Sequence, residues 1–527
     1  MKKLLFLITS TLFLFFFLFT TPCTAKQINI LVHPFENTGD KEYSWISAGM
    51  TDTVITDLTS IRDISVVTNQ DRKKVLEELR LAQSGLVEED KMIKIGKLTG
   101  AQVIFTGSYL VSGNRIRVNA RLVNVETGKV ENSTKIDGTL NGIFELQDKV
   151  VFTLMSETEK ITIADIKPVK LTEQDRKKIE EKPKPKLTAY EWYAKGLEVQ
   201  DTNPKEALAN FKKAIDIDPS YNDALMEAGW TAGSTLNLFS EGLGYLEKAE
   251  RNFKGRNETK SSGYASLMNN MGNFYRNKGQ LDRALEYNLK SQSTRDGLGL
   301  QNTAGYASLM NNIGIVYDRK GQLDRALEYT LKSQSIHDGL GLQNTADYAG
   351  LMNNIGTVYY SKGQLDRALE YYLKDKSIED GLGLQNTAGY ASLMNNIGSV
   401  YGVKGQLDHA LEYNLKSQST RDGLGLQNTA GYASLMNNIG TIYRNKGQLD
   451  RALGYFLKSQ STYDGLGLQN TAGYANLMNN MALSYEKQGK RDMAGRYFRL
   501  AYDTYVKSDY SGEWRDKALN NAKRLGY

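Results

Sequence analysis

The chain has 527 residues, of which 40% are hydrophobic and 24% are charged, and its formal net charge is +6. This length exceeds what one ordinary hydrophobic core holds, so we expect several folded units. Acidic and basic residues are interspersed along the chain and form no basic stripe, which argues against nucleic acid as a partner.

Cysteine and histidine are too scarce for most catalytic or metal sites. Cys23 is the only cysteine, and the three histidines, His33, His337 and His409, lie far apart in the sequence. Zinc sites built on cysteine are therefore excluded, and a histidine-centred metal or acid–base site is not expected. No glycine-rich phosphate loop follows a predicted strand, and no Ser/His/Asp order stands out. We predict no catalytic, cofactor-binding or metal-binding residues, and hence no enzyme.

The first 25 residues have the pattern of a secretory signal peptide. Two lysines precede an apolar run over residues 4–19, and small residues follow before Ala25. Cleavage after Ala25 predicts an exported protein, periplasmic or associated with the outer membrane. Two alternatives remain open: lipidation of Cys23, and retention of the apolar run as an anchor, although 16 residues are short for a bilayer of about 30 Å.

Residues 26–165 are predicted to form an α/β domain. Arginine and asparagine alternate with apolar residues over 115–122, which is typical of a half-buried strand, and turn residues at 112–114 and 126–128 indicate hairpins on both sides. The apolar patterns predict, in chain order, strand 28–32, helix 45–58, strand 64–67, helical segments at 75–79 and 92–98, strand 115–122 and helix 142–161.

The next segment, residues 166–187, is predicted to be a charged linker containing proline. Residues 165–186 include eight Lys or Arg, five acidic residues and three prolines. Such a composition favours a semi-extended, solvated spacer over a packed core. Docking of its basic residues on an anionic surface is the less favoured alternative.

The rest of the chain is repetitive, with a period of 42 residues. In the first copy, apolar residues from Tyr264 to Tyr275 follow helical spacing, Gly279 ends this helix, and a second apolar stripe begins at Leu281. One such pair of helices cannot bury its apolar faces alone, so stacked neighbours complete the core. The six copies are marked by Tyr264, Tyr306, Tyr348, Tyr390, Tyr432 and Tyr474.

Three kinds of repeated residue have predicted structural roles. The tyrosines are expected to pack in the core, and the small residues Gly272 and Ala284 are expected to let the two helices of a unit approach closely. A row of aspartates is expected to cap the second helices or to pair with nearby Lys or Arg, not to bind metal. This row consists of Asp282, Asp324, Asp366, Asp408 and Asp450.

The repeat pattern Leu/Met-x-x-x-Gly-x-x-Tyr…Gly…Ala-Leu/Ile resembles the tetratricopeptide repeat (TPR). The 42-residue period and the Asn-Asn-Ile-Gly run resemble the longer repeats of kinesin light chains. We assign residues 188–254 to two ordinary TPR-like units, residues 263–510 to six 42-residue units, and residues 511–527 to a capping helix. The resemblance implies an all-α superhelix, an α-solenoid, that binds a protein or peptide and needs no cofactor.

The N-terminal domain is similar to the TolB amino-terminal and FlgO-like envelope domain, and more distantly to the curli-secretion protein CsgG. The similarity rests on residues 32–37, 48–51, 100–108, 115–118, 125–128 and 144–148. It implies a place in an envelope assembly and leaves open self-association through this domain and association with the envelope membrane. His33 departs from the small or apolar residue usual there, and pore formation is doubtful because no long alternating apolar insertion is present.

The polar face of the first helix is the candidate binding groove. Its first asparagine is constant in all six copies, while its neighbours diverge although the core residues stay fixed. A constant asparagine row could hydrogen-bond a peptide backbone while the variable residues select side chains. The alternative is that exposed positions drift and asparagine satisfies local groups. The candidates are Asn269, Asn273, Arg276, Asn311, Arg319, Asn353, Tyr360, Asn395, Asn437, Arg444 and Asn479.

We therefore expect a non-enzymatic interaction scaffold of the bacterial cell envelope with a partner in the TPR groove. The alternative is an accessory component of an envelope secretion or assembly complex that oligomerises through its CsgG-like domain. A third class, an enzyme or ligand sensor, is disfavoured by the scarcity of histidine and cysteine.

Overall fold

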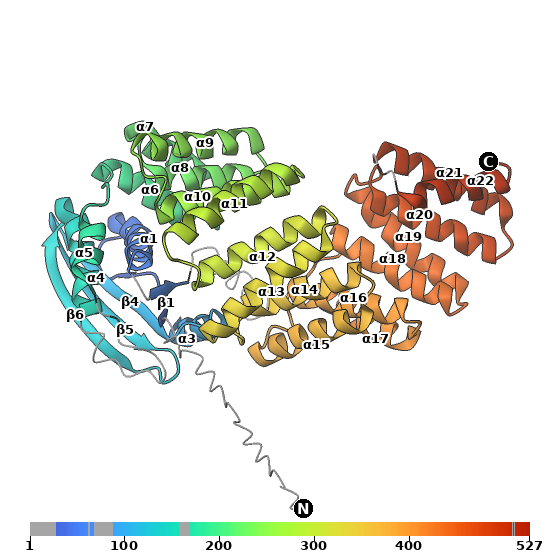
Figure 1. Cartoon of the computed structure of the whole chain (residues 1–527), viewed down its shortest axis with the longest axis horizontal. Coiled ribbons are helices and arrows are strands. Elements are labelled where there is room, and N and C mark those ends of the chain that lie inside the picture. Colours follow the sequence, from blue (N-terminus) through green and yellow to red (C-terminus); the bar gives the residue numbers. More distant parts are fainter. Residues whose placement is uncertain are drawn as a thin grey trace, which may run out of the picture.

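The computed structural model describes residues 28–61, 64–67, 88–156, 169, 171–508, 510 and 512–527. Within them an α/β domain precedes a long series of helical pairs (Figure 1), which confirms the predicted fold class. The expected signal peptide and the helical segment at 75–79 lie outside the described residues.

The α/β domain is built on one mixed sheet of six strands. Five strands lie in the order β3-β1-β4-β5-β6, and β2 pairs with β4 outside this order. β3 and β4 both pair with β1 in parallel, and β2 pairs in parallel with β4. β4, β5 and β6 form the two predicted antiparallel hairpins. The strands are β1 (Ile28–Val32), β2 (Glu36–Asn37), β3 (Ile64–Val66), β4 (Val103–Ser112), β5 (Arg115–Asn124) and β6 (Val130–Thr139).

Helices cover both faces of this sheet because its strands carry apolar residues on both sides. Helix α1 (Trp45–Thr59) and helix α4 (Ile143–Ser156) pack on the face that includes Ile30 and Phe105. Helix α3 (Glu88–Leu98) packs on the other face, against Leu31 and Ile104. On β5 the predicted alternation is confirmed: the apolar residues from Ile116 to Leu122 are buried, and the arginines between them are exposed.

The prediction that the charged linker is semi-extended is wrong for residues 173–180, which are helical. The segment contains helix α5 (Glu173–Glu180), which begins with a reciprocal capping box between Thr172 and Asp175. Ile179 and Val169 are buried in the core that the domain shares with the first helical pairs. The composition of the segment did not indicate helix α5, because one buried isoleucine and one cap are enough to stabilise a short amphipathic helix whose other residues remain solvated.

The α/β domain and the first helical pair form one continuous packed body. Gly49 on α1 lets helix α6 (Leu187–Val199) approach, since an added Cβ there would lie 2.7 Å from the Tyr190 hydroxyl oxygen. Gln147 Nε2 donates to the same hydroxyl at 2.8 Å. The Tyr193 hydroxyl donates to Asp52 Oδ2 at 2.7 Å. Both tyrosines are fully buried, so this junction is firmly packed.

Two carboxyl groups at this junction are withdrawn from water. Burial, together with the nearby charge of Asp223, raises the pKa of Asp52 to about 7. Burial also raises the pKa of Asp57 to about 6, although Lys182 Nζ, 3.5 Å from Asp57 Oδ1, opposes the shift. The protonated forms of these carboxyls are therefore favoured by folding.

The remaining helices stack as consecutive antiparallel pairs (Figure 1). A short π-helix over Thr231–Thr235 interrupts the second pair. The helices are α6 (Leu187–Val199), α7 (Pro204–Ile217), α8 (Asn222–Trp230), α9 (Phe239–Gly255), α10 (Ser262–Asn277), α11 (Leu281–Gly297), α12 (Ala304–Arg319), α13 (Leu323–Leu340), α14 (Ala346–Ser361), α15 (Leu365–Leu382), α16 (Ala388–Val403), α17 (Leu407–Gly423), α18 (Ala430–Asn445), α19 (Leu449–Gly465), α20 (Ala472–Lys487), α21 (Arg491–Lys507) and α22 (Glu513–Arg524).

Each 42-residue unit is one helical pair, from α10–α11 (unit one) to α20–α21 (unit six). A Cβ on Gly272 would lie 1.9 Å from the Asn288 side chain and 3.1 Å from the Ala284 carbonyl oxygen, so the predicted close approach is confirmed. The tyrosines that begin the units are buried as expected. Their hydroxyls also bind the preceding unit: that of Tyr306 donates to Asp296 Oδ1 at 2.7 Å.

Candidate interaction site

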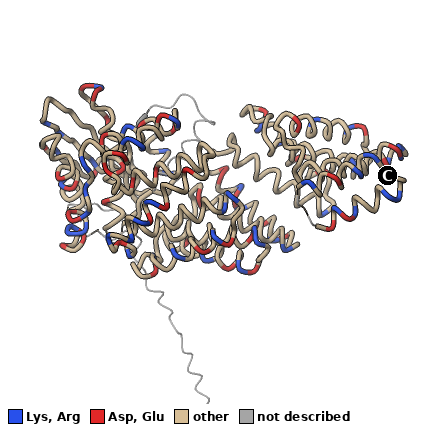
Figure 2. The backbone as a smooth tube through the Cα atoms, turned by 90° about the horizontal axis from the view of Figure 1, so that it is seen from above, with Lys and Arg blue, Asp and Glu red and all other residues tan. Residues whose placement is uncertain are grey.

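The first helices of the units line the inner side of the array. Successive first helices contact one another, from α10 with α12 to α18 with α20. Helices that are closer to their neighbours lie on the concave side of a superhelix, and the second helices form the outer side. We call the polar surface of the first helices the inner face. Figure 2 shows Lys and Arg interspersed with Asp and Glu along the array.

The constant asparagines of the inner face are joined into a continuous row by hydrogen bonds between units. Asn312 Nδ2 donates to Asn269 Oδ1 at 3.3 Å, and Asn354 Nδ2 donates to Asn311 Oδ1 at 3.1 Å. The next three bonds are equivalent and each is 3.0 Å long: Nδ2 of Asn396, Asn438 and Asn480 donates to Oδ1 of Asn353, Asn395 and Asn437, respectively. Five of the six constant asparagines are partly exposed, and Asn479 in the last unit is buried.

This row changes what the constant asparagines can offer a partner. Each Oδ1 in units one to five already accepts a bond from the next unit, so the groups left for a ligand are chiefly the Nδ2 donors. A donor row suits the carbonyl oxygens of an extended backbone. The second asparagine of each Asn-Asn pair was not among the sequence candidates, although its equal constancy in the repeats was a visible signal.

Arg276 and Arg444 occupy the same position four units apart and share one arrangement. Arg276 Nη1 donates to Asn312 Oδ1 at 3.3 Å, and Arg444 Nη1 donates to Asn480 Oδ1 at 2.8 Å. Among the described residues, no carboxylate lies within 4 Å of either guanidinium to form an ion pair. Burial and the charge of Arg319 lower the pKa of Arg276 to about 10, and burial also lowers the pKa of Arg444.

The partial burial of these two guanidinium groups therefore costs free energy in the unbound protein. A partly desolvated cation whose bonds go to neutral amides lacks the counter-charge that usually compensates burial. A carboxylate from a bound partner would supply that counter-charge. Arg319 is exposed beside Arg276 and donates from Nη1 to the Arg276 carbonyl oxygen at 3.3 Å, which adds positive charge to the same end of the inner face.

Two other sequence candidates are less accessible than expected. Asn273 is only 4% exposed, because the preceding pair covers this part of α10: Phe274 packs against Phe239, with ring centroids 5.6 Å apart. Asn273 is therefore not available to a partner in this structure. Tyr360 is partly buried, and burial raises the pKa of its hydroxyl.

The aspartate row on the second helices does pair with lysine, as predicted. Asp282 pairs with Lys320, and Asp324, Asp366 and Asp408 pair with the equivalent lysines of the following units. Asp450 accepts from Gln488 Nε2 at 2.8 Å. In the part of the chain that the structure describes, no group of three or more His, Cys, Asp or Glu side chains could hold a metal ion.

Comparisons with known protein families agree with this architecture. Residues 263–337 and 431–507 match one tetratricopeptide repeat model, and residues 349–377 match another. The chain carries tetratricopeptide repeats. Residues 18–111 match the model of the curli production assembly/transport component CsgG. The N-terminal domain is thus CsgG-like, and the units form a TPR array.

Three solved structures are among those that match parts of the chain. BtubC (BKLC) from P. vanneervenii is 17% identical, with a TM-score of 0.33, over 47% of this chain and 91% of that chain. The apo form of RapI is 14% identical, with a TM-score of 0.42, over 53% of this chain and 98% of that chain. A Podosopora anserina putative kinesin light chain is 13% identical, with a TM-score of 0.34, over 40% and 99%.

One curated relative is named "Putative adenylate cyclase 3", from Rhizobium meliloti (strain 1021). It is 26% identical over 242 residues, which are 43% of this chain. The match spans 38% of that protein's length, so the two chains share only a part. Within the described residues, no helix is both long and apolar enough to cross a membrane.

Proposed function

We propose that the protein is a non-enzymatic scaffold of the bacterial cell envelope, which holds an acidic segment of a partner protein on the inner face of its TPR array. The observation that carries the proposal is the pair of partly desolvated arginines, Arg276 and Arg444, whose bonds go to neutral asparagines. A partner carboxylate at each would compensate the guanidinium charge.

The asparagine row supports an extended partner chain between the two arginines. Donors repeated once per unit suit a backbone that runs along the array, while the divergent position shared by Asp318 and Tyr360 would select side chains. The CsgG-like domain supports a role at the envelope, where we place the protein after export and cleavage behind Ala25. Amino-terminal sequencing of protein from cell fractions tests that placement.

Site-specific photo-crosslinking in the native envelope tests the partner proposal. A photoreactive phenylalanine at Tyr360 reports on the inner face, and one at Leu373, which is 38% exposed on α15, reports on the outer face. Adducts are expected at position 360 alone, with captured peptides rich in Asp and Glu. The double variant Arg276→Gln, Arg444→Gln should deplete them. Equal labelling at positions 360 and 373, or labelling that the two arginine substitutions do not change, would exclude the inner face as the binding surface.

A second candidate is an accessory role in an envelope secretion or assembly complex, with self-association through the CsgG-like domain. The match of residues 18–111 to the CsgG model favours it. Sedimentation of the full chain discriminates: a concentration-independent monomer speaks against this role, whereas a closed oligomer supports it.

A further inference from the structure

The loop that connects one unit to the next has the same sequence in five places but not the same exposure. The sequence Asp-Gly-Leu-Gly-Leu-Gln-Asn-Thr-Ala spans residues 296–304, 338–346, 380–388, 422–430 and 464–472. Its second leucine is buried in the second and third of these loops, where Leu342 is 5% and Leu384 is 1% exposed. The equivalent leucines of the other three loops are partly exposed. Because the sequence is constant, the difference comes from what covers the loops.

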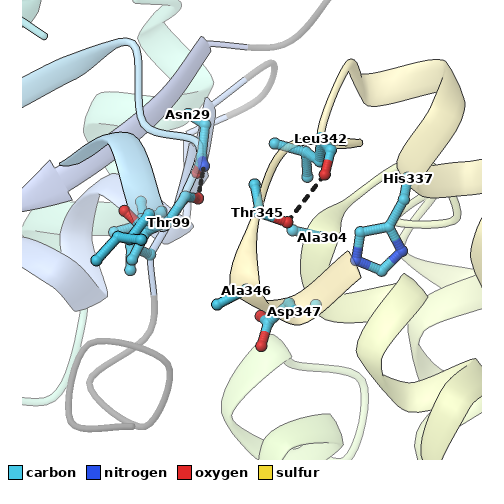
Figure 3. Close-up of a pocket in the computed structure, with 12 residues that line it drawn as sticks. Asn29, Thr99, Ala304, His337, Leu342, Thr345, Ala346 and Asp347 are labelled. Atoms are coloured by element: carbon cyan, nitrogen blue, oxygen red, sulfur yellow. Dashed lines mark hydrogen bonds between the residues drawn. The ribbon is translucent and has the colours of Figure 1, made fainter. Parts of the chain in front are cut away.

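The CsgG-like domain covers these two loops. Ala346 and Leu384 belong to one apolar cluster with Leu31, Leu98 and Ala101, on the α3 side of the sheet. Figure 3 shows Asn29 and Thr99 of the domain facing Leu342, Thr345 and Ala346 of the array across a small pocket, whose cavity is about 30 Å³.

Contact is closest at Gly100, between α3 and β4. Its φ of +67° is the left-handed conformation that favours glycine. A Cβ there would lie 2.5 Å from Thr345 Cγ2 and 2.9 Å from Leu342 Cδ2. A side chain at this position would crowd the Thr345 methyl group and the end of the Leu342 side chain, so glycine permits this close contact.

The contact is specific to the middle of the array. His337 and Asp347 line the cavity on the array side. Glycine follows the other four loops at the position of Asp347. The position of His337 is variable, with Arg295, Glu379, Arg421, Tyr463 and Tyr505 in the other five units. The repeated sequence therefore departs from its pattern at the place where the array meets the domain.

The array is thus held to the domain at two points of different character. The first point is the α1–α6 junction, with fully buried tyrosines and hydrogen bonds to Asp52 and Gln147. The second point joins loops through leucine, alanine and a threonine methyl. The pairs from α6 to α11 share one core with the domain, whereas unit two, between them and the second point, has a separate core. The second contact can open while each pair keeps its packing, because a superhelix of pairs bends a little at every interface.

We propose that this second contact is a releasable latch, in which loops 338–346 and 380–388 close the array on the CsgG-like domain and cover its edge at residues 98–101. Release lets the array beyond unit one swing away and exposes that edge. The latch depends on the loop contacts alone and not on a ligand of the inner face, so it can fail or succeed independently of the proposed function.

Charge substitutions in the full chain test the latch with a matched control. Leu342→Asp with Leu384→Asp places two carboxylates in the apolar contact, whereas Leu300→Asp with Leu426→Asp makes the same change in loops that the domain does not cover. The first pair should increase the maximum dimension in small-angle X-ray scattering. It should also speed hydrogen exchange of residues 92–101 at least tenfold. The control should do neither, and equal behaviour of the two pairs would overturn the proposal.

A disulfide trap tests the closed state directly. A Cβ on Gly100 lies 3.9 Å from Thr345 Cβ, within the range of natural disulfides. In a Cys23→Ser chain, Gly100→Cys with Thr345→Cys should oxidise to an intramolecular disulfide that keeps the Leu384→Asp variant compact. Gly100→Cys with Thr429→Cys should not form one. The single Gly100→Cys variant, compared by circular dichroism, reports whether the strained cysteine itself disturbs folding. Failure of the first pair to oxidise in a folded chain would show that the contact does not persist in solution.

Discussion

Replacing Asn414 by phenylalanine should stabilise the fourth unit. Asn414 on α17 is fully buried, and neither its Nδ2 nor its Oδ1 has a hydrogen-bond partner in the structure. In unit five the equivalent residue is Phe456, also fully buried, and the facing first helices are identical over 390–398 and 432–440. A Cβ on Gly398 would lie 2.8 Å from Asn414 Nδ2, and one on Gly440 would lie 2.5 Å from Phe456 Cε1, so the two side chains occupy the same site.

The magnitude follows from three opposing contributions. Removing the unpaired buried amide returns about 1–3 kcal/mol. Burying the phenylalanine ring adds about 1.5–3 kcal/mol, and crowding in the smaller site costs about 1–3 kcal/mol. We expect a net gain of about 2 kcal/mol for Asn414→Phe. The reciprocal change Phe456→Asn should cost about 3–5 kcal/mol, since it leaves a cavity and buries an unpaired amide.

Urea unfolding and native-state hydrogen exchange measure both changes. The urea midpoint for Asn414→Phe should rise by roughly 0.7–2 M for a denaturant slope of about 1–3 kcal/mol/M. Amides of α16 and α17 should gain most of the protection, because stability in a repeat array is nearly additive by neighbour. A lower midpoint for Asn414→Phe, with Asn414→Leu also destabilising, would refute the idea that unit four has room for the side chain of unit five.

Three further predictions concern the junction, the packing of helices within a unit, and the array length. Because burial raises the pKa of Asp52 to about 7 from an unfolded value of 3.8, the folded state binds the proton more tightly, so this group's stabilisation is lost as pH rises through about 7. Unfolding free energy should fall by about 2–3 kcal/mol from pH 5 to pH 8, and Asp52→Asn should remove most of that slope. Gly440→Ala should lower the free energy of unfolding, measured in urea, by about 1–3 kcal/mol, whereas Gly454→Ala, in open space on α19, should raise it slightly. Deleting residues 432–473 should shorten the particle in scattering without exposing residues 92–101; loss of cooperative helical melting would contradict the neighbour-only packing.

The array was predictable because its period is visible in the sequence. Tyrosine and glycine spaced by 42 residues, together with one apolar stripe per helix, determine the pairs and their stacking. The α/β domain was predictable where alternation is strong, as in β5. Strand β6 is almost entirely polar, from Val130 to Thr139, and only the turn before it indicated a hairpin.

The candidate site was predicted less completely, because its properties depend on contacts between units. The constant asparagines were found, but their bonds to the second asparagine of the next unit require the stacking geometry. The burial of Asn273 depends on the irregular pair before it. Nothing in the repeated loop sequence could reveal that two copies are covered, and among the cavity-lining residues of units two and three only Asp347 replaced an otherwise constant residue.

The separation between Gly100 and Thr345 has a consequence for biogenesis. A chain that emerges amino-terminus first completes the α/β domain, which ends with α4 at Ser156, about 180–230 residues before the covering loops are made. At typical synthesis rates of about 5–20 residues per second, this interval lasts roughly 10–50 s. For that time the apolar margin around Leu98 stays open to water, so newborn chains should depend on a chaperone more than finished ones do.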